Sequence, residues 1–268
     1  MPLPTRVTLA PAQRPSGGLL TAAQPIGDGW ERGVTFSTPI CAAPQVVGEC
    51  NDPNGNGQVT KDTSRPSALA VFSPFGIVQA IECSTLGRTD VGLLADQSLD
   101  VTREFAVARE LLTGAASSNP NLGQATSLGA AADPVTALGC LDQHAAEQLS
   151  GRLAFIHASP AIAARWLAEG ALWRDGAVWR TALGSVVVIS GGFDGRSPGG
   201  DAPGGGDTLW AYATGEVYAQ VGLRETRMSV QRPINTAEAW AEEAGVVVFD
   251  PCFVTAIDTT VVFCEAGS

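Results

Sequence analysis

The sequence predicts an α+β fold, and three features of its 268 residues support that prediction. Residues 91–114 have the pattern of one long amphipathic helix. Stretches that alternate apolar and polar residues, which are typical of strands, occur on both sides of it. Between residues 133 and 190, helical and strand-like segments alternate at short intervals, as in a compact α/β unit. Because an apolar stripe must be buried, we expect the long helix to pack on strands from residues 77–83 and 246–258.

The composition favours a protein with a large core and a surface partly covered by partners. Hydrophobic residues make up 45% of the chain and charged residues only 16%, below the usual quarter. The net charge is −11, and Lys61 is the only lysine. Because binding to phosphates requires clustered cations, this charge pattern argues against direct binding to nucleic acid.

The sequence also indicates where the protein works. It contains no apolar run long enough for a transmembrane helix, and its Pro-rich N-terminus lacks the apolar core of a signal peptide. We therefore expect no membrane association and use without secretion. The six cysteines form no CxxC pair, so most are expected to be small buried residues in a reducing compartment, with a Cys41–Cys50 bridge as the alternative.

The first third of the chain predicts an arm followed by a long hairpin. Residues 1–33 are rich in proline and glycine and should form an extended arm that lies on the body or on a neighbour, or else is disordered. Strand patterns then occur at 34–36, 69–72 and 77–81. The polar, turn-rich stretch 48–66 should form the tip of the hairpin.

The long helix should begin among acidic and hydroxyl side chains and end at Gly114, a residue that readily takes the left-handed conformation of a helix stop. Its predicted buried stripe repeats at helical spacing and consists of Leu94, Val101, Phe105, Ala108 and Leu112. On this prediction, Phe105→Asp should unfold the region around the helix.

The middle of the chain supplies the α/β unit. A loop is expected over residues 115–132, and Asp133-Pro134 has the pattern of a helix start. Ser159-Pro160 should begin a second helix. The predicted strands of this unit are 153–157, 177–181 and 185–190.

The C-terminal third predicts a returning sheet. Residues 191–207 contain eight glycines and should form a flexible loop. Residues 237–244 favour a short helix or a polar break, in which Glu238, Glu242 and Glu243 form a solvated face. The predicted strands are 208–213, 216–221, 227–231, 245–250 and 253–258.

One stretch resembles a calcium-binding loop. Asp52, Asn54 and Asn56 match its first, third and fifth positions, but Thr63 occupies the twelfth, where a carboxylate belongs. Asn, Gly and Pro also make ordinary turns. We therefore favour a plain loop and predict no metal site.

No catalytic or cofactor site is predicted. His144 and His157 fall on an expected helix and an expected buried strand, where a lone histidine is usually structural. Ser185 lacks the second glycine of a nucleophile elbow, and the glycine run 199–206 lacks the Lys of a phosphate loop. We predict neither an enzyme nor a cofactor. The tryptophans at 166, 173 and 179 favour core packing, with subunit contacts as the alternative.

Taken in order, these elements resemble the major capsid proteins of tailed bacteriophages and the encapsulin shells that share the Hong Kong 97 fold. Residues 103–114, REFAVARELLTG, look like the family's spine helix. Residues 210–217, WAYATGEV, are similar to the segment that leaves the A-domain, and residues 246–258 are similar to the closing strands of the P-domain. The words LLTG and YATGEV are similar to capsid-like proteins of actinobacterial phages.

The resemblance implies a Hong Kong 97-like capsid fold with an N-arm, an extended hairpin (E-loop), a spine-helix P-domain and an α/β A-domain. The implied ranges are 1–33 for the N-terminal arm, 34–83 for the E-loop hairpin and flanking strands, 84–125 for the P-domain spine helix, 126–225 for the A-domain and 226–268 for the P-domain closing strands.

The function implied by the resemblance is self-assembly. Hexamers and pentamers would close into an icosahedral virion shell around double-stranded DNA, without specific DNA binding, after assembly in the bacterial host cytoplasm. Scaffolding, portal and decoration proteins are the further partners. The alternatives are an encapsulin-like nanocompartment shell on the same fold, and a non-assembling α/β binding module.

Some members of this family crosslink a hairpin lysine to an asparagine of an adjacent subunit with the help of a glutamate. Lys61 lies in the predicted hairpin tip, but no motif identifies its partners. Asn235 and Glu238 match them in residue type alone. We therefore expect Lys61 to be an ordinary exposed loop lysine.

Overall fold

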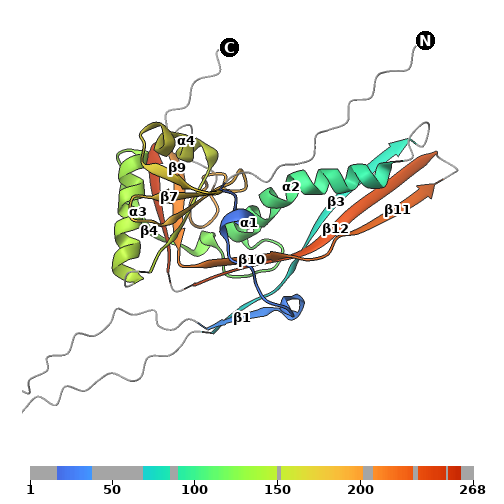
Figure 1. Cartoon of the computed structure of the whole chain (residues 1–268), viewed down its shortest axis with the longest axis horizontal. Coiled ribbons are helices and arrows are strands. Elements are labelled where there is room, and N and C mark those ends of the chain that lie inside the picture. Colours follow the sequence, from blue (N-terminus) through green and yellow to red (C-terminus); the bar gives the residue numbers. More distant parts are fainter. Residues whose placement is uncertain are drawn as a thin grey trace, which may run out of the picture.

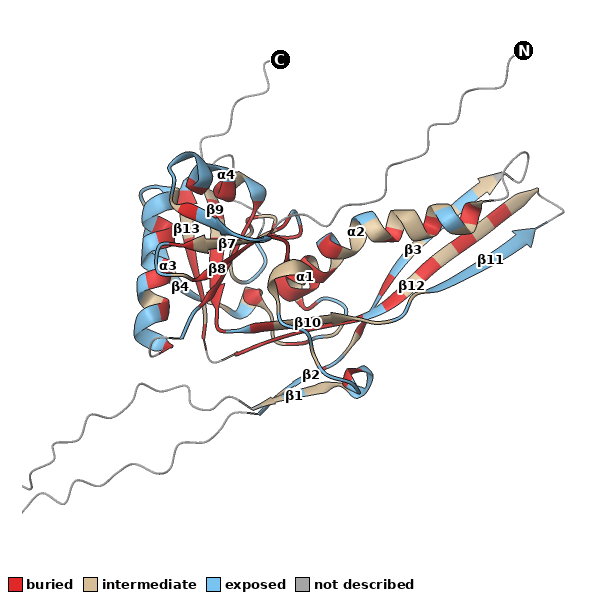
Figure 2. Cartoon of the chain, viewed as in Figure 1, coloured by how far each residue is buried: buried red, intermediate tan, exposed pale blue. Residues whose placement is uncertain are grey.

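The computed structural model describes residues 17–37, 69–84, 90–149, 152–201, 208–231, 235–251 and 253–260. A long helix, α2 (Val91–Thr113), lies along an elongated sheet on one side of the molecule, and a second, wider sheet with two helices makes up the other side (Figure 1). Burial is concentrated between the layers of both parts (Figure 2). No helix in the described part of the chain is both long and apolar enough to cross a membrane.

The elongated sheet is antiparallel and is organised around one long strand, β12 (Thr236–Phe249). One side of β12 pairs with β3 (Phe75–Ser84). Its other side pairs first with β11 (Glu225–Gln231) and then with β10 (Val217–Val221). The prediction that α2 packs on strands from both sides of it in sequence is confirmed for β3 and for residues 246–249 of β12. It is wrong for the last predicted strand, because β13 (Val254–Thr260) belongs to the wider sheet.

Helix α2 ends where the sequence predicts. Gly114 follows its last residue in the left-handed conformation (φ 59°), and its N–H donates to the Glu110 carbonyl at 2.7 Å. A Cβ at this position would lie only 2.7 Å from the Asn119 carbonyl oxygen. Glycine is therefore required both by the backbone conformation and by the close approach of the next loop.

The predicted buried stripe of α2 is only partly correct. Ala108 and Leu112 are buried, but Leu94 is half-buried, and the side chains of Val101 and Phe105 are 63% and 50% exposed. We call Leu94, Val101 and Phe105 the α2 stripe. Phe105 is therefore not a core residue, and the burial on which the Phe105→Asp prediction rests is not found.

The helix changes partners along its length, which explains this difference. Its first half rests on one sheet and buries Val91, Ala95 and Leu99. Its second half is also covered by α1 (Leu19–Ala22) and the 3-10 turn η2 (Leu122–Gln124), so it buries a different side. A single helical period cannot describe a stripe that rotates around the axis.

The wider sheet has seven strands in the order β4-β13-β9-β5-β8-β7-β6. Helices α3 (Pro134–Gln148) and α4 (Pro160–Ala168) form a separate core with it that includes Leu141, Ile156 and Trp166. Residues from its strands, such as Phe155 and Tyr212, also join the core that contains α2. Side chains alternate across a sheet, so one set of strands supplies both cores.

Most elements of this unit follow the prediction. The side chain of Asp133 accepts hydrogen bonds from the Val135 and Thr136 amides at 2.9 Å and so begins α3. The predicted strands appear as β5 (Phe155–Ala158), β7 (Val178–Thr181), β8 (Val186–Ile189), β9 (Thr208–Thr214) and β13 (Val254–Thr260). Strand β6 (Leu172–Asp175) is not predicted, because most of its residues are exposed.

Two predictions of irregular structure are wrong. The expected loop 115–132 contains β4 (Thr126–Ala131), a largely exposed edge strand whose small residues give no apolar alternation. The expected helix or break at 237–244 lies within β12. Ala237, Ala239 and Ala241 are its buried positions beneath α2, and alanine favours a helix unless tertiary packing decides otherwise.

The described part of the N-terminal segment is packed rather than extended over the surface. Leu19 in α1 and Trp30 in the 3-10 turn η1 (Trp30–Arg32) are buried. Strands β1 (Val34–Ser37) and β2 (Leu69–Phe72) then form the base of an antiparallel hairpin, as predicted.

Several predictions fall outside the described residues. They concern the calcium-like loop from Asp52 to Thr63, Lys61, the Cys41–Cys50 pair and residues 202–207 of the glycine loop. Of the cysteines in the described part of the chain, Cys83 is half-buried and Cys140 is exposed, so the expectation of burial is wrong for Cys140. Cys140 lies on the outer side of α3.

Candidate assembly surfaces

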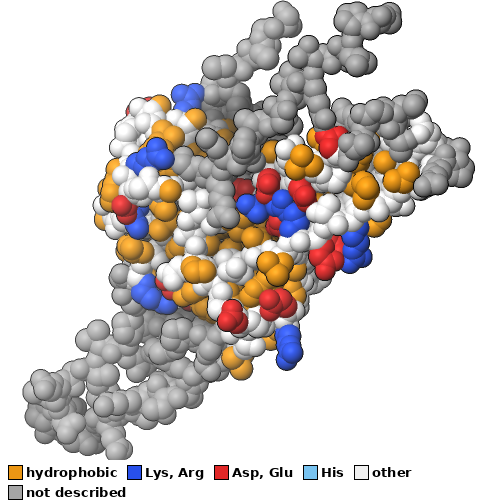
Figure 3. Space-filling view, turned by 45° about the vertical axis from the view of Figure 1, so that its right-hand side comes forward, with side chains coloured by type: hydrophobic (Ala, Val, Ile, Leu, Met, Phe, Trp, Pro, Cys, Tyr) orange, Lys and Arg blue, Asp and Glu red, His pale blue; other side chains and the backbone are white. Residues whose placement is uncertain are grey.

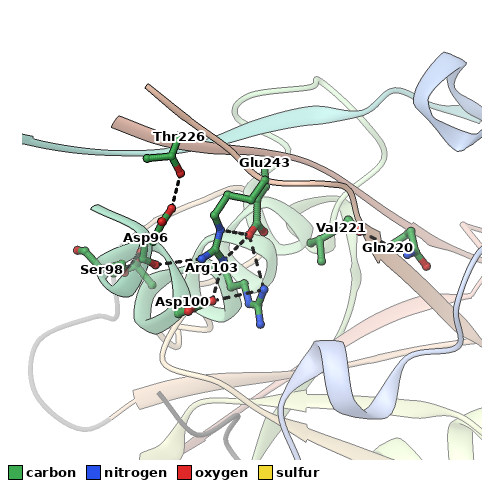
Figure 4. A network of polar contacts seen from close by, with 10 residues as sticks. Asp96, Ser98, Asp100, Arg103, Gln220, Val221, Thr226 and Glu243 are labelled. Carbon is green, nitrogen blue, oxygen red and sulfur yellow. Dashed lines mark hydrogen bonds and ion pairs between the residues drawn. The ribbon is translucent and has the colours of Figure 1, made fainter. Parts of the chain in front are cut away.

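A polar network joins α2 to the elongated sheet (Figure 4). The guanidinium of Arg224 donates to Glu243 at 2.5 Å and to Asp100 at 2.6 Å, and its Nη1 donates to the Asp96 carbonyl at 3.2 Å. Arg103 lies 3.6 Å from the same Glu243 oxygen. The side-chain hydroxyl of Thr226 donates to Asp96. Two arginines and two carboxylates thus hold the middle of the helix against the sheet.

Burial makes this network different from a surface ion pair. The side chain of Glu243 is only 2% exposed, although the sequence predicts a solvated face for it. In β12 the residues alternate, so Glu243 points toward α2 while Glu242 points to the other face of the sheet. The hydrogen bond to Asp100, together with the Glu243 carboxylate, raises the pKa of Arg224. A buried carboxylate of this kind depends on its arginine partners.

Two further carboxylates of α2 hold the segments on either side of the helix. Glu104 accepts hydrogen bonds from the amides of Leu19 and Leu20, the latter at 3.1 Å, and so fixes the start of α1. Glu110 accepts from the Ala116 and Ser117 amides at 3.0 and 2.9 Å. Both glutamates are buried, and neither is distinguishable in sequence from a solvated helix residue.

The base of the hairpin is fixed by one asparagine. Asn119 accepts from the Ser73 amide at 2.7 Å and donates to the Ser73 carbonyl at 2.8 Å. This two-way contact ties the β2–β3 connection to the loop after α2. The direction in which β1 and β2 leave the body is therefore set by the end of the long helix.

The first half of the glycine loop is packed on α2, contrary to the prediction of flexibility. A Cβ at Gly192 would lie 2.5 Å from the Phe105 carbonyl oxygen, so the loop approaches the helix backbone closely. Arg109 donates to Asp194 at 2.5 Å, and Arg196 donates to it at 2.8 Å. Burial opposes ionisation of Asp194, but the hydrogen bonds from Arg196 and Arg109 outweigh it and lower its pKa to about 2.

The residues weighed for catalysis are not brought together. His157 is fully buried and its Nε2 lies 2.9 Å from the hydroxyl of Thr214. His144 packs near the Phe253 ring, and Ser185 is buried immediately before β8 (Val186–Ile189). Within the described ranges, no group of three acidic, His or Cys side chains is placed to hold a metal ion.

The surface carries exposed hydrophobic side chains on both parts of the molecule. Figure 3 shows acidic and basic side chains together near the centre of one face, with hydrophobic side chains around them. A groove of about 650 Å³ runs between α2 and the start of β3, lined by Phe75, Ile77 and Phe105. On the other face of the sheet, Leu223 is 94% exposed beside Val78. Such surfaces are typical of proteins that associate.

Solved structures of a GTA-particle capsid and of phages share this architecture along nearly the whole chain. The capsid of a native GTA particle gives a TM-score of 0.60 at 9% identity, covering 98% of this chain and 96% of that chain. Mycobacterium phage Ogopogo gives 0.57 at 14% identity, covering 96% and 97%. Gordonia phage Cozz gives 0.53 at 16% identity, covering 96% and 91%. The chain has the Hong Kong 97-like capsid fold.

The similarity is one of structure. No protein-family model matches the sequence, and no curated protein matches it either. With identities of 9–16%, this Hong Kong 97-like fold is recognised by the order and pairing of its elements. The fold class predicted from the sequence is confirmed, including the long helix as its central element.

Proposed function

We propose that this chain is a major capsid protein, which self-assembles as hexamers and pentamers into an icosahedral shell enclosing double-stranded DNA. The observation that supports this most strongly is the full-length structural match, since both chains are covered by more than nine-tenths in each comparison given above. On this proposal the protein has a structural and non-enzymatic role in the virion. We propose the division into N-arm, E-loop, P-domain and A-domain expected from the sequence, with two changes: β10 belongs with the P-domain sheet and β13 with the A-domain sheet, according to their pairing.

The physical properties of the chain support the proposal that it forms a container for DNA. Its net charge of −11 and single lysine give it little attraction for packaged DNA. The hairpin base formed by β1 and β2 is a two-stranded sheet, which is marginal by itself and is stabilised when another surface covers it. Leu69 and Val71 on β2 are exposed and available for such contacts.

Expression of the full chain followed by size-exclusion chromatography and electron microscopy tests the proposal. Closed shells of uniform diameter are expected. A stable monomer at every concentration, alone and with a co-expressed scaffolding protein, would contradict it. Nuclease-protected double-stranded DNA inside particles from infected cells separates a virion from a compartment that carries a cargo enzyme.

A further inference from the structure

The most regular amphipathic pattern in the sequence is left partly unburied by the fold. The α2 stripe of Leu94, Val101 and Phe105 repeats at helical spacing, yet Val101 and Phe105 are largely exposed. Exposed apolar side chains are common one at a time, but Val101 and Phe105 share one helix face with the half-buried Leu94, and together they form a stripe about 16 Å long, from 1.5 Å per residue. We expect another segment to cover a stripe of this kind and remove it from water.

The N-terminal segment leaves the body next to this stripe. Glu104, which fixes the amides of Leu19 and Leu20, lies between Val101 and Phe105 on the same helix. The Gly17 carbonyl accepts from the Ile189 amide at 2.8 Å. Two residues after Ile189, a Cβ at Gly191 would contact the Phe105 ring at 3.6 Å. Residues 1–16 therefore join the described chain within reach of Phe105.

The sequence of residues 1–16 matches the stripe in length and polarity. This stretch, MPLPTRVTLAPAQRPS, contains no acidic residue and four prolines, which favour an extended chain. In an extended chain Leu3, Val7 and Leu9 share one face, while Arg6 and Arg14 share the other. Leu3 and Leu9 would be separated by about 20 Å, close to the length of the stripe.

We propose that residues 1–16 fold back along α2 and cover the α2 stripe of their own chain. Their connection through Gly17 and the Glu104 anchor makes this contact intramolecular, with a high effective concentration. Leu3, Val7 and Leu9 face the helix and the two arginines face solvent. The contact is a property of the single chain, so it does not depend on whether the protein forms shells.

Photo-crosslinking from position 105 tests the contact. Phe105 is replaced by benzoylphenylalanine, which keeps an aromatic ring, and the unassembled full chain is irradiated. An equal mixture of ¹⁵N-labelled and unlabelled chains distinguishes contacts within one chain from contacts between copies. The control carries the probe at Leu223, which is 94% exposed and lies with Val78 on the other face of the sheet.

We expect monomer-sized products in which position 105 is joined to residues 3–9 of a chain with the same label, at least about tenfold more than from position 223, a ratio that corresponds to about 1.4 kcal/mol. A full-chain variant with serine at Leu3, Val7 and Leu9 should lose the product, and circular dichroism should show that it remains folded. Mixed-label products, crosslinks to residues 38–68, or equal yields at the two positions would overturn the proposal.

Discussion

At the scale of single residues, the structure depends on buried charges whose partners are distant in sequence. Glu243 is paired with Arg224 and Arg103, and the Arg224–Asp100 contact spans 124 positions. Desolvation penalises each ion, so the network is stable only when complete. The neighbouring Glu242 is an internal comparison, because it is more than a third exposed and pairs with Arg227 at 3.4 Å on the other face of the sheet.

Glu243→Gln should lower the free energy of unfolding by about 3 kcal/mol, because it leaves two arginines with one carboxylate partner. The matched control Glu242→Gln should cost less than about 1 kcal/mol, as expected of an exposed pair. Urea unfolding followed by circular dichroism measures both. Similar losses in the two variants would show that the network is not the stabilising feature.

His157 makes the free energy of unfolding of the protein sensitive to acid. The Thr214 hydroxyl donates to the Gly215 carbonyl at 2.9 Å and so accepts from His157 Nε2, which leaves Nδ1 as the site of protonation. Among the described residues Nδ1 has no partner. Burial lowers the pKa of His157 from 6.5 to about 3. The unfolded state therefore binds the extra proton first, and stability falls as the pH falls from about 6.5 towards 3.

His157→Gln should remove this contribution to the pH dependence of stability. Wild-type stability should decline by up to about 1.4 kcal/mol per pH unit below 6.5 from this group alone, and the variant should show a correspondingly flatter profile. Urea unfolding between pH 4 and 8 measures the two slopes. Parallel profiles would contradict the assignment.

At the scale of elements, α2 carries two different interfaces on one helix. Its first half lies on β3 and β12, and Leu99 is buried in the core that also contains three alanines of β12. Its second half is enclosed by α1 and η2 as well. Apolar side chains on the same helix therefore differ widely in their contribution to stability, according to which half and which side they occupy.

Leu99→Ala should cost about 2–5 kcal/mol, since it removes buried methyl groups from the contact between α2 and the sheet. Phe105→Ala should cost only about 1 kcal/mol, because Phe105 lies outside the buried cores of the body. Thermal and urea unfolding provide the comparison. A larger loss at Phe105 than at Leu99 would place the core on the other side of the helix.

At the scale of the whole molecule, the hairpin joins the body at its base, where Phe72 is buried and its ring lies 5.7 Å from that of Phe249. Strands β1 and β2 form their own two-stranded sheet, in which Ser37 pairs with Leu69, and Asn119 fixes its base through Ser73. The cores around α2 and around α3 are built from other elements for the most part. Folding of the chain and assembly of its copies should therefore respond differently to shortening of the hairpin.

Replacing residues 38–68 by Asn-Gly should leave a folded chain that no longer forms closed shells. The two-residue turn fits because Ser37 and Leu69 are directly opposite in the ladder. Circular dichroism should show an unfolding temperature close to that of the full chain, and electron microscopy should show no closed particles. Normal shells from the shortened chain would rule out a role for the hairpin in assembly.

The sequence by itself determined the elements whose signals are local. Residues 91–114 form a helix because of their periodicity and the glycine stop, and Asp133-Pro134 begins α3 because an aspartate caps free amides. The apolar strands β5 and β8 follow from their β-branched and aromatic residues. With the order of these elements, the fold class was predictable.

Only the tertiary structure decided features that depend on contacts between distant segments. Ala237, Ala239 and Ala241 belong to a strand because their small side chains are buried beneath α2, although alanine alone favours a helix. Glu243 is buried because Arg224 and Arg103 pair with it. No local sequence pattern around Glu243 predicts these ion pairs. For α2, local sequence determines that the helix forms. Which of its faces is buried depends on the segments that pack on it, and these change along its length.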